Sequence, residues 1–139
     1  MAAFVKYEQF VLDLGLKLHD LNTDTLKIAL TNTAPTVATD AVLLDITEIS
    51  AGNGYTAGGT DSTNTYTEAA GVGSCVGVDV VFTASGGTIG PFRYAVLYND
   101  TQTVPVDPLI GYWDYGSSVT LQDGETFTVD FGTEMFTIT

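Results

Sequence analysis

The N-terminal part of the chain shows two hydrophobic periods in succession. Between residues 5 and 21 apolar side chains recur every three or four positions, which is typical of an amphipathic helix. From residue 25 the period changes to two, because Leu26, Ile28 and Leu30 alternate with more polar neighbours. The pattern predicts a helix over about 5–21 and then a strand. The apolar face of the helix would consist of Tyr7, Phe10, Val11, Leu14, Leu18 and Leu21.

The middle of the chain has a weaker pattern. Residues 37–49 fit a short helix that buries Val42, Leu43, Ile46 and Ile49, although this interpretation is ambiguous. Residues 50–65 are rich in Gly, Ser, Thr and Asn, which predicts a long surface loop that includes a short extended stretch at Tyr55. Loops of more than about 12 residues in a compact domain are usually functional or disordered.

The second half reads as a series of short strands. Phe92, Tyr94, Val96 and Tyr98 would share one face of their strand, and Gln122-Asp123-Gly124 is a tight hairpin signal. The predicted strands span residues 76–84, 92–99, 109–115, 118–121, 125–131 and, at the edge, 135–139. We therefore predict a single domain over 1–139, mainly β with one N-terminal helix (about 5–21) and a β part over about 24–139. A jelly-roll-like β-sandwich or a small barrel fits this strand spacing.

Charge narrows the possible partners. Among the 139 residues, 17 are Asp or Glu and 4 are Lys or Arg, giving a formal net charge of −13. Such a surface repels phosphate, so nucleic acid and anionic membranes are not expected partners, whereas basic protein patches are. Neither a bilayer-spanning run nor a signal peptide is evident, which predicts a soluble chain made in a cytoplasm.

Residues that commonly carry chemistry are scarce. Cys75 is the single cysteine and is predicted to be a small buried apolar residue, and His19 is the single histidine, expected to satisfy carbonyl groups at the helix end. Neither a zinc site nor a calcium-loop motif can be assembled, so no metal or cofactor is predicted. The carboxylates that could form a glycosidase pair are Asp114, Glu125, Asp130 and Glu134, and a small hydrolase would use Asp114 with Glu125 or Asp130. Solvated surface charge is the commoner explanation for all of them. The chain is not expected to be an enzyme.

Aromatic residues form the one unusual cluster. Phe92, Tyr94, Tyr98, Tyr112, Trp113 and Tyr115 lie within a short stretch, where they would serve either core packing or an interface. Side chains of neighbouring residues on a strand point to opposite faces of the sheet, so Tyr112 and Trp113 cannot both face one core. A partner subunit is one way to cover the second face. Arg93, the only arginine, suits a buried ion pair or an interface anchor. The candidate interface residues are Tyr55, Arg93, Tyr112, Trp113 and Tyr115.

Three segments and the N-terminal helix-to-strand region carry a family resemblance. They are residues 45–59 (DITEISAGNGYTAGG), 81–100 (VFTASGGTIGPFRYAVLYND) and 108–116 (PLIGYWDYG), preceded by residues 7–33. Together they resemble capsid decoration (cement) proteins of short-tailed bacteriophages, over nearly the whole chain. The resemblance implies a compact, jelly-roll-like β domain on the exterior of the virion. It would bind the major capsid protein shell near local symmetry axes and stabilise the head as a homodimer or other small homo-oligomer.

Two other functional classes stay open. A tail or tail-fibre component, acting as a carbohydrate-binding β-sandwich, would use Trp113 and the nearby tyrosines as a stacking platform. A small hydrolase would use the carboxylates named above.

Overall fold

A five-stranded antiparallel sheet forms the larger layer of the protein. The computed structural model describes residues 2–139. In sheet order the strands are β1 (Phe4–Lys6), β8 (Leu109–Leu121), β7 (Ile89–Asn99), β2 (Leu26–Thr31) and β3 (Thr60–Asp61). Every pair in this sheet is antiparallel. The predicted class, mainly β with one N-terminal helix, is confirmed.

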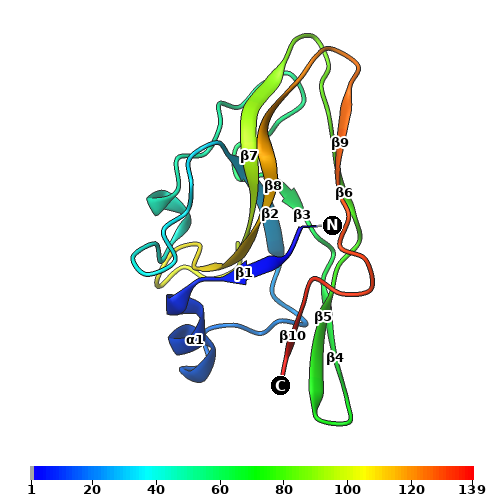
Figure 1. Cartoon of the computed structure of the whole chain (residues 1–139). Coiled ribbons are helices and arrows are strands. Elements are labelled where there is room, and N and C mark those ends of the chain that lie inside the picture. The colour runs from blue at the N-terminus through cyan, green and yellow to red at the C-terminus, as the bar shows by residue number, and fades with distance from the viewer. Residues whose placement is uncertain (1) are drawn as a thin grey trace.

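Two smaller sheets make up the second layer (Figure 1). One pairs β6 (Val80–Thr83) with β9 (Thr126–Val129), and the other has the order β10 (Phe136–Ile138), β5 (Val72–Val76), β4 (Thr65–Ala69). The main hydrophobic core lies between the layers, because it joins Ile28 and Trp113 of the large sheet to Phe82, Phe131 and Cys75. The arrangement is that of a β-sandwich.

The helix α1 (Glu8–Gly15) adds Phe10 to the main core. The outer face of the large sheet is also covered, by the 3-10 turn η1 (Leu43–Asp45) and the loops around it (Figure 1). A second apolar cluster fills this side, with Tyr7, Ala29, Val96 and Tyr98 among its buried members. The central strands β2 and β7 are therefore buried on both faces. This burial explains why the positions between Leu26, Ile28 and Leu30 are largely shielded as well.

The helix is shorter than the predicted span of 5–21. The first residues of the predicted span, Val5 and Lys6, instead belong to β1, which pairs with β8. The end of the helix is set at Lys17, which adopts a left-handed conformation with φ 69°. The N–H of Leu18 donates to the oxygen of Asp13 at 2.9 Å, which closes the helix in a Schellman motif. Val11, predicted to be buried, is 56% exposed because only part of the predicted face reaches the sheet.

Residues 50–65 lie largely at the surface, as predicted, but they are anchored to the body of the protein and include the short strand β3. The hydroxyl of Tyr55 donates to Glu48 at 2.6 Å and accepts from the backbone N–H of Leu30 at 3.0 Å. Gly59 packs so closely on β2 that a Cβ there would lie 1.7 Å from the backbone oxygen of Ile28. The neighbouring segment 37–49 forms only the three-residue turn η1 in place of the expected helix.

Strand boundaries differ from the prediction in two places. The predicted strand 76–84 is divided between β5 and β6, which belong to different sheets, whereas segments 109–115 and 118–121 are one continuous strand, β8. The turn at 122–124 forms, with the N–H of Glu125 donating to Gln122 at 2.9 Å and Gly124 at φ 87°. The strands that it joins do not pair, however, because β9 crosses to the other layer and pairs with β6.

The close approach of Gly59 to β2 gives a stability test. Gly59→Ala combines a left-handed alanine at φ 76° with a backbone clash, and should lower the free energy of unfolding by at least about 3 kcal/mol. Gly86→Ala is the matched control, since Gly86 has φ 81° and nothing within 4 Å of its added Cβ. Gly86→Ala should lower the free energy of unfolding by about 1 kcal/mol. Equal losses in urea denaturation would show that the segment does not pack on β2.

Candidate functional site

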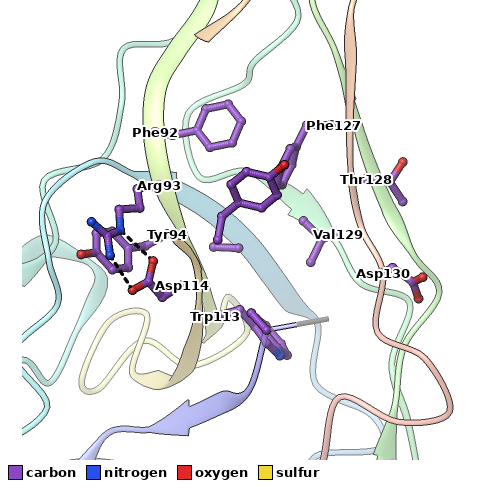
Figure 2. A pocket seen from close by; sticks show the side chains of 12 residues that line it. Phe92, Arg93, Tyr94, Trp113, Asp114, Phe127, Thr128, Val129 and Asp130 are labelled. Atoms are coloured by element: carbon purple, nitrogen blue, oxygen red, sulfur yellow. Dashed lines mark hydrogen bonds and ion pairs between the residues drawn. The ribbon is translucent and has the colours of Figure 1, made fainter. Parts of the chain in front are cut away.

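An open groove lies between β8 and β9, where the two layers separate. Its volume is about 490 Å³. Its apolar walls are formed by Phe92, Trp113, Tyr115, Phe127 and Val129. Figure 2 shows Phe92, Phe127 and Val129 around the space between the strands. The molecule thus has a preformed cleft that opens to solvent.

A β-bulge builds the β7–β8 wall. Phe92 is opposite Val119 and Tyr94 is opposite Asp114, so four residues of β8 (115–118) face the single residue Arg93 of β7, an excess of three. Phe92 consequently packs in the main core, while Tyr94 contacts Tyr112 on the other face of the sheet. The prediction that Phe92 shares a face with Tyr94, Val96 and Tyr98 is therefore wrong, because it assumed an unbroken period of two.

Aromatic contacts across the groove connect the two walls. The ring of Phe127, on β9, lies 4.9 Å from that of Phe92 and 5.2 Å from that of Tyr115, both in edge-to-face geometry. Edge-to-face aromatic contacts stabilise a structure by more than the burial of their apolar area alone. Tyr115 keeps 57% of its surface exposed, so one of its ring surfaces is available to a ligand.

The β9 wall is a strand edge. All four residues 127–130 line the groove. The side chains of Phe127 and Val129 point into it, whereas those of Thr128 and Asp130 are directed to the other side of β9 (Figure 2). Within residues 2–139, β9 pairs with β6 and with no other strand. Sequence analysis identified the strand but had no signal for its unpaired edge, because pairing partners cannot be deduced from alternation alone.

Arg93 forms an ion pair beside the groove. Its Nε and Nη2 atoms lie 2.8 Å and 3.0 Å from the two carboxylate oxygens of Asp114. Hydrogen bonding to Arg93 lowers the pKa of Asp114, and hydrogen bonding to Asp114 raises the pKa of Arg93. Both side chains are more than a third exposed, so water screens the pair and it contributes little to stability.

The carboxylates considered for glycoside hydrolysis have local structural partners. Asp114 is held by Arg93 and also accepts from the N–H of Gly116 at 2.8 Å. Glu125 accepts from the N–H of Gln122, and Asp130 from the N–H of Gly132. A lowered pKa keeps Asp114 ionised, which is the wrong state for a general acid.

The five predicted interface residues do not form one patch. Arg93, Trp113 and Tyr115 line the groove, although Trp113 is only 5% exposed. Tyr112 is half-buried on the opposite face of the sheet. Tyr55 is 2% exposed and belongs to the core, which corrects its assignment to an interface.

His19 and Cys75 are both buried. Burial raises the pKa of the Cys75 thiol to about 12, so this cysteine is the inert core residue that its sequence context predicted. His19 lies beyond the helix, where its Nδ1 is 3.0 Å from Nδ2 of Asn99, and the same amide donates to Asp24 at 2.7 Å. The histidine therefore binds a side-chain network and not the helix-end carbonyls that we expected.

No group of three or more His, Cys, Asp or Glu side chains in residues 2–139 is arranged to hold a metal ion. In the same part of the chain, none of the helical segments has the length and apolar character needed to cross a membrane.

Comparisons with known proteins return no match: no family model, no curated protein and no solved structure matches this chain. The function of the groove is therefore inferred from its geometry and chemistry.

The buried histidine should make stability depend on pH. Burial lowers the pKa of His19 more than nearby Asp13 and Asp24 raise it. Below its ordinary pKa of about 6.5, the unfolded chain binds a proton at His19 that the folded chain does not. Stability from this group is thus complete above about pH 6.5 and is lost as the pH falls, by at most about 1.4 kcal/mol per pH unit.

His19→Gln is the matched variant for this test, since it keeps a hydrogen-bonding side chain without a titration near neutrality. Urea denaturation between about pH 7.5 and about pH 5.5 should show wild type losing stability relative to the variant. Parallel curves for the two proteins would contradict a neutral, buried His19.

Proposed function

We propose that this protein is a capsid decoration (cement) protein of a tailed bacteriophage, binding the outside of the major capsid protein shell and stabilising the head. The observation that carries the proposal is the open groove, which joins apolar walls to an unpaired strand edge. Strand edges and apolar clefts are features by which proteins bind other proteins. The resemblance of segments 45–59, 81–100 and 108–116 to decoration proteins supports the shell protein as the partner.

The charge of the molecule supports a protein partner with basic patches. The net charge is −13, and in residues 2–139 the ion pairs are Lys27 with Asp100 and Arg93 with Asp114. Most carboxylates are therefore without a cationic partner in the chain. Complementary charge on a shell would steer association and fix its register. A head protein bound outside the shell is also kept away from packaged DNA, which such a surface would repel.

Assembly as a homodimer or other small homo-oligomer is part of the proposal. Repeated copies on a symmetric shell add many small interfaces, and closed symmetry uses the same surface on each copy. Apolar side chains exposed outside the groove, such as Leu44 at 91% and Val104 at 85%, are available for such contacts. They lie on the loops that cover the outer face of the large sheet.

A tail or tail-fibre component that binds carbohydrate is the second candidate. It is favoured by one observation, the exposed ring of Tyr115 above the groove. An aromatic ring of this kind can stack on a sugar. The deeper part of the groove has apolar side chains, so sugar hydroxyl groups placed there would lack hydrogen-bond partners.

Binding to phage heads tests the proposed function. Purified protein, mixed with emptied heads and sedimented, should saturate at a fixed ratio to the major shell protein and raise the temperature at which heads disrupt. Binding should weaken as salt increases, because the surface charges are exposed. Absence from heads, together with presence in tail fractions, would contradict the proposal and favour the tail component.

A further inference from the structure

The edge of β9 that faces away from β6 has backbone groups available for another strand. The N–H of Ala84 donates to the oxygen of Glu125 at 2.9 Å, which fixes the alternation of bonded pairs along β6 and β9. Phe82 and Phe127 then form a bonded pair, and Val81 and Thr128 do not. The N–H and C=O of Thr128 therefore point away from β6. No other strand in the described part of the chain pairs with this edge.

Side chains along this edge alternate between two environments. Phe127 and Val129 face the apolar groove, and Thr128 and Asp130 face the opposite side (Figure 2). A strand added beside β9 would follow the same alternation, because cross-strand neighbours share a face. Every second side chain would enter the groove beside Phe127 and Val129, and the intervening ones would lie near Thr128 and Asp130.

Charge selects the kind of strand that fits. Asp130 forms no ion pair within residues 2–139, so a basic side chain opposite it would be favoured. A second copy of this chain would instead place another Asp130 and Glu125 nearby, on a molecule that also carries −13. Like charges on facing strands are destabilising, so a second copy is the poorer occupant.

We propose that the groove and the β9 edge bind an extended segment of a partner protein in which apolar residues alternate with Lys or Arg. The segment adds a strand next to β9, places its apolar side chains in the groove beside Phe127 and Val129, and directs its basic side chains toward Asp130. This inference deepens the proposed function, since the shell protein would supply the segment. Main-chain hydrogen bonds provide affinity in this mode of recognition, and the alternating side chains provide specificity.

A titration with synthetic peptides tests the inference directly. Trp113 is the only tryptophan of the chain and lines the groove, so its fluorescence reports occupancy. The probe is a short peptide of alternating valine and lysine. Two controls change one feature each: serine replaces valine in the first, and glutamate replaces lysine in the second. The valine–lysine peptide should change the fluorescence saturably, and neither control should do so.

Two proline variants then locate the binding edge. Thr128→Pro removes an N–H that points away from β6, at the free edge of β9, without breaking a bond between β6 and β9. Val81→Pro makes the same change on the outer edge of β6, opposite Thr128 in the same sheet. The first should weaken peptide binding by at least about threefold, the value of one main-chain hydrogen bond, and the second should leave it unchanged. Tyr115→Ala, at an exposed position, should also weaken binding.

Several results would overturn the inference. The first is that the serine–lysine peptide binds as tightly as the valine–lysine peptide. The second is that the two proline variants, both folded by circular dichroism, bind the valine–lysine peptide with equal affinity. The third is that the valine–lysine peptide does not bind at all. Dimerisation that Thr128→Pro abolishes would assign the edge to a second copy. A neutral oligosaccharide that displaces the peptide would assign the groove to a sugar.

Binding of wild type and Thr128→Pro to phage heads distinguishes failure of this inference from failure of the proposed function. If heads bind wild type and Thr128→Pro equally well, the inference fails and the proposed function stands. If wild type binds no heads, the proposed function fails, and the peptide titration alone decides the inference.

Discussion

The pairing of β7 with β8 is the interaction on which the other elements depend. It places Trp113 and Ile110 in the core between the layers, and Leu109 in the cluster on the opposite face. The second layer and the segments around η1 therefore both pack against the same pair of strands. Loss of this pairing would remove a wall from each hydrophobic cluster, which makes it the structural centre of the molecule.

The bulge in this pairing, together with the turn that follows β8, produces the groove. The bulge directs Phe92 toward the core and leaves Tyr115 exposed at the margin. The turn at 122–124 then carries the chain to the other layer, so β8 and β9 border a space without pairing across it. If β8 and β9 had paired as a hairpin at this turn, no open space would lie between them. The crossing leaves one strand edge unpaired and next to apolar side chains.

Sequence periodicity predicted the class of fold and several elements correctly, for physical reasons. Leu26, Ile28 and Leu30 form a strand as expected, and 136–138 forms an edge strand. The errors arose where tertiary contacts override local pattern. Val5 and Lys6 pair with β8 and are not part of the helix, and Tyr55 is drawn into the core by its bonds to Glu48 and Leu30.

The candidate site was only partly predictable. The aromatic content around Trp113 and Tyr115 pointed to a surface of interest, and both residues line the groove. Phe127 and Val129 were identified as alternating strand residues. Their role in the groove, however, depends on β9 having no second strand paired with it. Since the partner of a strand is decided by the whole topology, a local pattern could not reveal that this edge is unpaired.

Amide hydrogen exchange along β9 tests the central claim, that this edge is open beside the groove, most directly. In the free protein the N–H groups of Phe127 and Val129, bonded to β6, should be protected. The N–H of Thr128, which lies between them and faces away from β6, should exchange much faster. Protection of Thr128 equal to that of its two neighbours would show that the edge is already paired, and would contradict the account.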